Sequence, residues 1–311
     1  MCENSCMKWL ENVSLAPLTT FQIGGPARYL CEVRSERDVT EALAWAKENE
    51  LRHIILGGGS NVLVPDEGLD ALVVHFVGNL WSFGACEIDT WAGSNLFTLI
   101  EAAAMGKCGG WEKLAGIPGS IGGAVRGNAG AFGSEIKDFV ISVRALNAGT
   151  GEIRAFQHAE CDFSYRHSFF KEHPEWVITR VRLRLQQVDA TESAKLAEEI
   201  IAERERRHLQ NVRAAGSYFM NPVAPAGIVA QFEAEKGARS REHRVPAGWL
   251  IEKAGMKGAI VGGAIASLQH PNYLVNQNAA SAADVRALAA KVKDAVRATF
   301  DIELHEEAAL F

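Results

Sequence analysis

Apolar and polar positions along the chain predict strands and helices in alternation. Apolar residues recur at helical spacing in residues 38–49, 97–105 and 193–207, which is typical of helices with one buried face. Short apolar runs predict strands, and these runs are residues 53–56, 62–64, 71–76, 140–146 and 177–185. Residues 1–18 are only weakly patterned, so we expect a lead-in segment there.

The last helix has the clearest start. Ser281 is followed three residues later by Asp284, which resembles a capping box with Asp in place of the usual Glu. Its apolar stripe consists of Val285, Leu288, Val292 and Val296. A boundary between two parts of the chain is expected before this helix, near residues 187–215.

The first glycine run, Gly57-Gly58-Gly59-Ser60-Asn61, lies between two predicted strands. A Rossmann fingerprint needs a third spaced glycine and a helix directly after the turn. Here Val62 opens a strand instead. The pattern therefore disfavours a Rossmann fold.

A second glycine-rich stretch covers residues 114–136, and the two clusters hold ten of the 29 glycines. Small residues allow successive backbone N–H groups to face one concavity, which suits a pyrophosphate. Ser60 and Ser120 could add hydroxyl donors. Either cluster alone is equally consistent with tight turns between strands. Two of them, about sixty residues apart, favour a dinucleotide bound by an α+β flavin-binding fold.

Composition and charge narrow the function classes. The chain has 311 residues, 48% of them hydrophobic and 23% charged, and this is ordinary for a protein of two or three compact units. A net charge of −6 argues against a nucleic-acid partner, although it allows a local basic pocket for a small anion. No apolar run is long enough for a membrane span or resembles a signal peptide, so we expect a cytoplasmic protein.

The six cysteines do not form a metal-binding pattern. They are Cys2, Cys6, Cys31, Cys86, Cys108 and Cys161. Only the first two lie close in sequence, and no second Cys or His pair completes a site. We therefore expect no metal and reduced structural thiols.

Seven segments, in sequence order, resemble those of the UDP-N-acetylenolpyruvoylglucosamine reductase family. They are TTFQIGGPA at 19–27, LGGGSNVLV at 56–64, GIPGSIGGAVRGNAGAFG at 116–133, CDFSYR at 161–166, GSYFMNP at 216–222, AGWLIE at 247–252 and IELHEE at 302–307. One such match would be weak, but seven in order cover nearly the whole chain.

The resemblance implies a fold and a domain division. It implies an α+β protein with a non-Rossmann FAD-binding fold of the vanillyl-alcohol-oxidase (PCMH) type. This FAD-binding domain would cover residues 17–190, as two α/β subdomains of about 17–78 and 79–190. A C-terminal α+β substrate-binding domain would cover residues 206–311.

The resemblance also implies a reaction. NADPH would reduce FAD, and the enolpyruvyl group of UDP-N-acetylenolpyruvoylglucosamine would then be reduced to give UDP-N-acetylmuramate. Arg166 would stabilise the negative charge that develops on the substrate carboxylate, and Glu307 would donate a hydrogen bond if burial keeps it protonated. Ser217 would deliver the proton to C2. Taken alone, each residue is more typical of a structural position: Arg166 of a solvated strand edge, Ser217 of a turn or helix cap, and Glu307 of the surface. The order of the surrounding motifs reverses this interpretation.

Binding residues follow from the same motifs. The residues expected to hold FAD are Gly57, Gly58, Gly59, Ser60, Asn61, Gly119, Ser120, Gly122, Gly123, Asn128 and Gly130. Asn221 would contact the substrate, and Arg207 and Arg244 would lie near its diphosphate. Met220 stands where family members frequently have Lys, so one expected cation is absent. The 185–215 link is too short for the substrate-clamping tyrosine loop of one subgroup.

Two alternatives remain from the sequence. One is another FAD-dependent oxidoreductase of the same fold that acts on a sugar or alcohol. Such enzymes often tether FAD through His or Cys near the first glycine loop, and residues 57–70 contain neither. The other is a non-catalytic nucleotide-binding protein, which would be expected to lack one of the three catalytic residues. We expect a monomer with no nucleic-acid or membrane partner.

Overall fold

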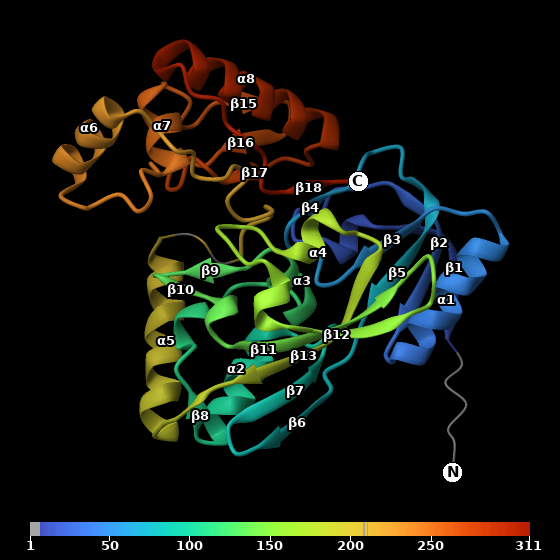
Figure 1. Cartoon of the computed structure of the whole chain (residues 1–311). Coiled ribbons are helices and arrows are strands. Elements are labelled where there is room, and N and C mark those ends of the chain that lie inside the picture. Colours follow the sequence, from blue (N-terminus) through green and yellow to red (C-terminus); the bar gives the residue numbers. More distant parts are fainter. Residues whose placement is uncertain (1–6, 208, 210) are drawn as a thin grey trace. The chain divides into compact units, whose positions relative to one another are not determined.

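The computed structural model describes residues 7–207, 209 and 211–311, and the chain forms two compact units (Figure 1). Unit 1 contains the described residues up to Val13 together with Ala27–Gly59 and Asp70–Glu205. Unit 2 contains Ser14–Pro26, Ser60–Leu69 and Arg206–Phe311. The first glycine run is therefore divided between the units after Gly59.

Unit 1 begins with a four-stranded sheet. Its strands, in spatial order, are β1 (Lys8–Ser14), β2 (Pro26–Val33), β5 (Leu69–Phe76) and β3 (His53–Leu56). β3 and β5 pair in parallel, with His53 opposite Leu72. Helix α1 (Glu36–Glu48) connects β2 to β3, and its buried face shares one core with buried side chains of β2 and β5.

Strand β1 lies within the weakly patterned segment that was expected to be a lead-in. Most of its side chains are exposed, including Trp9, whose ring lies 4.6 Å from that of Trp45. An edge strand with little burial does not need alternating apolar positions, because its backbone is satisfied by one neighbour. That is why the apolar pattern over Lys8–Ser14 is weak.

A five-stranded antiparallel sheet forms the rest of unit 1. Its strands are, in order, β12 (Ile153–Gln157), β11 (Val140–Asn147), β13 (Trp176–Arg184), β7 (Glu87–Trp91) and β6 (Trp81–Gly84). The helices of this part are α2 (Leu96–Met105), α3 (Ile121–Arg126), α4 (Phe169–Glu172) and α5 (Ala190–Arg206). Two short pairs complete it, β9 (Gly130–Ala131) with β10 (Ser134–Glu135) and β8 (Cys108–Gly109) with β14 (Gln186–Gln187).

Unit 2 has its own core, built on a small antiparallel sheet. The strands are β15 (Ile260–Val261), β16 (Ala264–Ala266) and β17 (Leu274–Asn276), and the helices are α6 (Ala226–Lys236), α7 (Ala247–Lys253) and α8 (Ala282–Phe300). Helix α8 packs along all three strands, and its buried stripe is the one read from the sequence. Ser281 and Asp284 form a complete capping box. β4 (Val62–Leu63) pairs in parallel with β18 (Ala309–Leu310).

The helices and strands predicted from the apolar pattern are therefore confirmed, with small shifts of their ends. Among the residues that the structure describes, no helix combines the length and the apolar character that a bilayer crossing requires. The same residues contain no group of three His, Cys, Asp or Glu side chains able to hold a metal ion.

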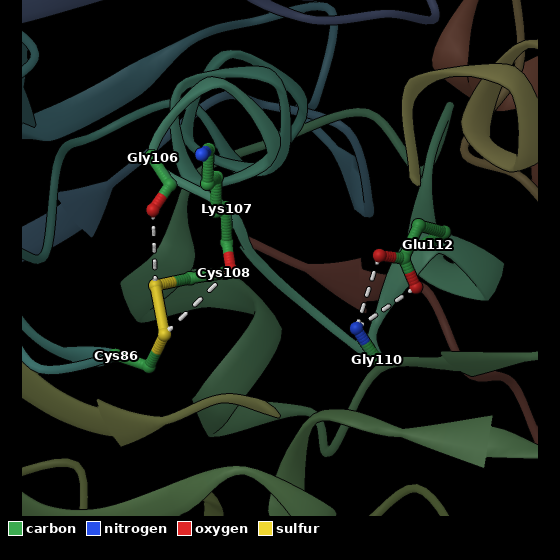
Figure 2. The surroundings of a disulfide bond; sticks show 6 residues. All are labelled: Cys86, Gly106, Lys107, Cys108, Gly110 and Glu112. Carbon is green, nitrogen blue, oxygen red and sulfur yellow. Dashed lines mark hydrogen bonds between the residues drawn. A yellow bond between two sulfur atoms is a disulfide. The ribbon is translucent and has the colours of Figure 1, made fainter. Parts of the chain in front are cut away.

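The expectation of reduced thiols is wrong for two cysteines. Cys86, in the turn between β6 and β7, forms a disulfide with Cys108 at the start of β8, and their Cα atoms lie 5.3 Å apart (Figure 2). No sequence pattern indicated the pair, because 22 residues separate the two cysteines and only the fold brings them together. Cys31 and Cys161 are buried free thiols, and burial raises the pKa of each to about 12. Cys2 and Cys6 lie outside the described residues.

Figure 2 shows the disulfide between Cys86 and Cys108, which joins the β6–β7 turn to the segment that precedes the second glycine stretch. Two residues after Cys108, the Gly110 N–H donates to both carboxylate oxygens of Glu112, at 3.0 Å each. The side chain of Glu112 is buried and also accepts from the Ser193 hydroxyl at 2.5 Å. The disulfide therefore links the β6–β7 turn to a segment that is hydrogen-bonded to a buried side chain of the core.

Reducing this disulfide should destabilise the protein. Closing a loop of 22 residues removes conformational entropy from the unfolded chain equivalent to about 3 kcal/mol. We expect dithiothreitol to lower the free energy of unfolding by roughly that amount in urea titrations. Cys86→Ser should show a similar loss and should no longer respond to the reductant. Equal stability of the oxidised and reduced wild-type protein would contradict the expectation.

Candidate active site

The two glycine clusters meet in unit 1 at Gly57-Gly58 and Gly119-Ser120. A Cβ built on Gly57 would lie 2.3 Å from Ser120 Oγ, and one on Gly58 would lie 2.6 Å from Gly119 Cα. These distances leave no space for side chains, so the two loops pack backbone against backbone. Gly119 also has a φ of +119°, which other residues rarely adopt. The expectation that the clusters act together therefore has a geometric basis.

This contact suits a bound pyrophosphate. Loops without side chains let a ligand approach the peptide N–H groups closely, and such groups bind anions well. The Ser120 hydroxyl caps α3 by accepting from the Gly123 N–H at 3.3 Å. A Cβ on Gly122 would meet that of Ala92 at 2.9 Å, so this glycine serves close packing. The residues present thus fit the diphosphate part of a dinucleotide such as FAD.

The second half of the glycine stretch is hydrogen-bonded to the arginine segment, residues 161–166. Arg166 lies in a tight turn in which Ser164 and His167 exchange backbone hydrogen bonds. Its Nη2 donates to Gly130 O at 3.1 Å. Asn128 is fully buried, and its Nδ2 donates to Ser164 O at 2.7 Å. The side chain of Asn128 is thus used to position the arginine turn.

Arg166 itself has a φ of +55°, a conformation that costs a non-glycine residue about 1 kcal/mol. The turn is held from several sides, since Ser168 Oγ also donates to Arg126 O at 2.7 Å. Lys171 Nζ donates to Arg166 O at 2.9 Å. A half-buried guanidinium fixed in this way is a preorganised cation, able to bind an anion without reorganising.

In unit 2, the serine segment (residues 216–222) and the glutamate segment (residues 302–307) lie side by side. Phe219 pairs with Glu306 in an antiparallel bridge. The Glu307 N–H donates to Tyr218 O at 2.8 Å, and the Met220 N–H donates to His305 O at 2.9 Å. The structure therefore brings the expected catalytic residues Ser217 and Glu307 near each other, although ninety residues separate them in sequence.

Of the two glutamates in the closing segment, Glu306 is engaged as an ion-pair partner of Lys293, at 3.1 Å. Glu307 is half-buried, and its backbone oxygen accepts from Asn61 Nδ2 at 3.1 Å. Asn61 O in turn accepts from the Ala309 N–H at 2.9 Å. The end of the first glycine run and the glutamate segment are thus joined within unit 2.

A pocket of about 320 Å³ opens beside the serine segment in unit 2. It is lined by Ser217, Asn221, Phe232, Lys236, Pro246, Gly248, Trp249, Glu252, His270, Pro271 and Asn272. Aromatic walls with a few polar groups are typical of sites for small organic molecules. Two of the residues expected from sequence, Ser217 and Asn221, are in this lining.

The two expected arginines lie close to this pocket. Arg244 Nη1 donates to Asn221 O at 2.9 Å. Burial lowers the pKa of His270, and the positive charge of Arg207 lowers it further, which places Arg207 near the His270 side of the pocket. Two arginines therefore lie near this pocket, and its lining contains one lysine, Lys236, and one carboxylate, Glu252. Such cations can attract a small anionic ligand.

Sequence reasoning missed several residues of the lining. Lys236 ends α6 just before Gly237, and the sequence alone gives it the appearance of a solvated helix end. His270 and Asn272 belong to a loop before β17 that no pattern singled out. Besides Ser217 and Asn221, the lining residues Gly248, Trp249 and Glu252 lie in a motif that the sequence had identified, AGWLIE at 247–252. The missing information was tertiary proximity.

Comparisons with known proteins agree along the chain. A family model described as "UDP-N-acetylenolpyruvoylglucosamine reductase, C-terminal domain" matches residues 207–311. A model described as "FAD binding domain" matches residues 27–157. Together with the observed elements, these matches confirm the α+β class, with an FAD-binding part followed by a C-terminal part.

Three similar proteins cover nearly the whole chain. The UDP-N-acetylenolpyruvoylglucosamine reductase of Solibacter usitatus is 36% identical, over 94% of this chain and 93% of its own length. That of Pseudomonas putida is 35% identical, over 98% of this chain and 99% of its own length. The crystal structure of the enzyme from Thermus caldophilus has a TM-score of 0.75 and 30% identity, and the match covers 98% of each chain.

Adding a methyl group at Gly58 should impair flavin binding. The new Cβ would meet the backbone of Gly119, which cannot rotate away, and forced overpacking of this kind costs about 1–3 kcal/mol. We expect Gly58→Ala to weaken FAD binding roughly tenfold or more, measured by fluorescence titration of the apoprotein. In Gly84→Ala, where a Cβ meets nothing within 4 Å, affinity should be unchanged. Equal FAD affinity of the two variants would contradict the proposed contact.

Proposed function

The chain belongs to the UDP-N-acetylenolpyruvoylglucosamine reductase family, and we propose that it reduces UDP-N-acetylenolpyruvoylglucosamine to UDP-N-acetylmuramate with FAD and NADPH. This is a step in the synthesis of peptidoglycan precursors. The structural observation that best supports the assignment is the pairing of the serine and glutamate segments beside a pocket lined by Ser217.

FAD would be held by the backbone of the two glycine clusters. The residues concerned are Gly57, Gly58, Gly59, Ser60, Asn61, Gly119, Ser120, Gly122, Gly123, Asn128 and Gly130. When bound, FAD takes up a hydride from NADPH and supplies it to C3 of the enolpyruvyl group. The buried Asn128 would contribute indirectly, by fixing the loop that surrounds it.

The chain's own residues would manage the charge and the proton. Addition of hydride to C3 leaves a negative charge at C2 that is delocalised into the adjacent carboxylate. We propose that Arg166 stabilises this charge, and a preorganised cation contributes several kcal/mol to such a step. Glu307, if burial keeps it protonated, would act by donating a hydrogen bond to the substrate. The Ser217 hydroxyl would give its proton to C2, which completes the saturated product.

The UDP part of the substrate would occupy the pocket of unit 2. Asn221 would contact it directly, and Arg207 and Arg244 would lie near the diphosphate. We add Lys236 to this set, because it lines the pocket while Met220 occupies the place of the usual family lysine. Its ion pair with the exposed Glu235, at 3.3 Å, is weak enough to be exchanged for a phosphate.

The remaining proposals concern the molecule as a whole. We propose a cytoplasmic monomer with no nucleic-acid or membrane partner. Residues 17–190 would act as the FAD-binding domain, with subdomains of about 17–78 and 79–190, and residues 206–311 as the substrate-binding domain.

The simplest test of the function is colour, since the purified protein should be yellow and should be bleached by NADPH. A protein that takes up no flavin would overturn the assignment.

Removing the Ser217 hydroxyl should separate the two half-reactions. In Ser217→Ala the flavin should be reduced by NADPH at the wild-type rate, because no proton donor to C2 is needed in that step. Reoxidation by the enolpyruvyl substrate should slow by at least about 100-fold, since general acid catalysis contributes that much or more. Stopped-flow absorbance of the flavin measures both rates. Equal slowing of both would exclude the proton-donor role.

Removing the positive charge of Lys236 should weaken substrate binding. We expect Lys236→Gln to raise the KM for the UDP-sugar roughly 5- to 10-fold, the effect of one charge-assisted contact in a partly exposed site. The KM for NADPH and the kcat should change little. Lys253→Gln is the matched control, because Lys253 pairs with the same Glu235 at 2.7 Å but does not line the pocket. An equal rise of KM in the control would contradict the assignment.

A further inference from the structure

Asn272 holds the backbone of the serine segment through hydrogen bonds on one side. Its Oδ1 accepts from the Phe219 N–H at 3.0 Å, and its Nδ2 donates to Phe219 O at 2.9 Å. Its own backbone oxygen accepts from the Tyr218 N–H at 2.7 Å. The side chain of Asn272 thus pairs with both the N–H and the C=O of Phe219, as the backbone of a neighbouring β-strand would.

The opposite side of the segment explains why this contact is needed. Around the Phe219–Glu306 bridge, the hydrogen bonds to residues 305–307 are made by Tyr218 and Met220, not by Phe219. In an antiparallel pair of this type, the N–H and C=O of the middle residue point away from the partner strand. Those two groups of Phe219 point toward Asn272, whose amide takes the place of a third strand.

The contact between Asn272 and Phe219 is also buried away from solvent. Asn272 is 2% exposed and Phe219 is 1% exposed. Buried peptide groups without partners cost about 1–3 kcal/mol each. Without the Asn272 amide, Phe219 would therefore have to shift until its N–H and C=O reached water or another partner.

Such a shift would reach Ser217, which is two residues away. On its other side Ser217 follows Gly216, which has a φ of +70° and around which a Cβ would meet nothing within 4 Å. The space beside Gly216 is therefore open, although Ala214 and Ala215 before it are buried in the core of unit 2. Because this open glycine separates the serine from that core, the position of the hydroxyl depends chiefly on the hydrogen-bonded residues after it.

We propose that Asn272 is a positioning residue for Ser217. By fixing the backbone of Phe219 it holds the hydroxyl where the proton is delivered to C2, and it does not itself need to touch the reacting atoms. The inference rests on the proposed role of Ser217. Misplacement of a reacting group by about 1 Å can slow a reaction by roughly 100-fold, so the expected effect is large.

The test uses Asn272→Leu in the full-length, FAD-loaded protein. Leu has a similar volume but can neither accept from the Phe219 N–H nor donate to its C=O. We expect flavin reduction by NADPH to stay within about 2-fold of wild type. Reoxidation by the enolpyruvyl substrate should slow roughly 10- to 100-fold, with a smaller change in the dissociation constant of the substrate.

Asn276→Leu is the matched control. Asn276 is 3% exposed and lies four residues further along the same segment. It also makes two side-chain hydrogen bonds to backbone, from Nδ2 to Phe21 O at 3.0 Å and to Oδ1 from the Ala280 N–H at 2.8 Å. Its loss should destabilise unit 2 in a similar way, seen in the melting temperature, without selective slowing of reoxidation.

A double-mutant cycle separates positioning from a general structural role. If Asn272 acts through the Ser217 hydroxyl, adding Asn272→Leu to Ser217→Ala should slow reoxidation by no more than about 2-fold beyond Ser217→Ala alone. Multiplicative effects, or equal slowing in Asn276→Leu, would overturn the proposal. If Asn272→Leu does not fold, Asn272→Asp keeps the acceptor and removes the donor, and it should show the same selective slowing. A wild-type protein without reductase activity would instead refute the proposed function.

Discussion

The architecture of unit 2 depends on one constraint, which is the hydrogen bonding of a short segment, residues 218–220. The backbone of this segment is paired with residues 305–307 on one side and with Asn272 on the other. Tyr218 and Phe219 are at the same time among the largest fully buried side chains. A buried segment must satisfy its peptide groups locally, so the end of the chain and the loop before β17 have to converge on it. The same loop contributes His270, Pro271 and Asn272 to the pocket lined by Ser217.

In unit 1, two distant segments also converge, and here the absence of side chains allows the contact. Gly57 and Gly58 approach Gly119 and Ser120 more closely than any side chain would allow. The other half of the same glycine stretch then binds the turn that carries Arg166, through Arg126 O, Asn128 and Gly130 O. One stretch of sequence thus has two tasks, a backbone surface for a diphosphate and a support for a fixed cation.

In both units, the groups proposed to act on the substrate are held by backbone contacts more than by side-chain packing. Arg166 has an unfavourable φ that its surroundings maintain, and Ser217 follows a glycine in the left-handed region. Chemistry of this kind depends on where groups are held before the reaction begins, since preorganised dipoles and charges need no rearrangement when charge develops. The supporting residues are therefore as informative about the reaction as the reacting ones.

The sequence by itself determined the succession of elements, because apolar periodicity reports which face of a helix or strand is buried. It also determined the family, since seven motifs in order, ending at Glu307, leave little freedom in function. It could not reveal β1, which is exposed and so carries no pattern, or the Cys86–Cys108 disulfide, whose partners are 22 residues apart. Tertiary structure alone decided that Lys236, His270 and Asn272 share a pocket with Ser217. Periodicity records burial within one element, whereas a site is made of contacts between elements distant in sequence.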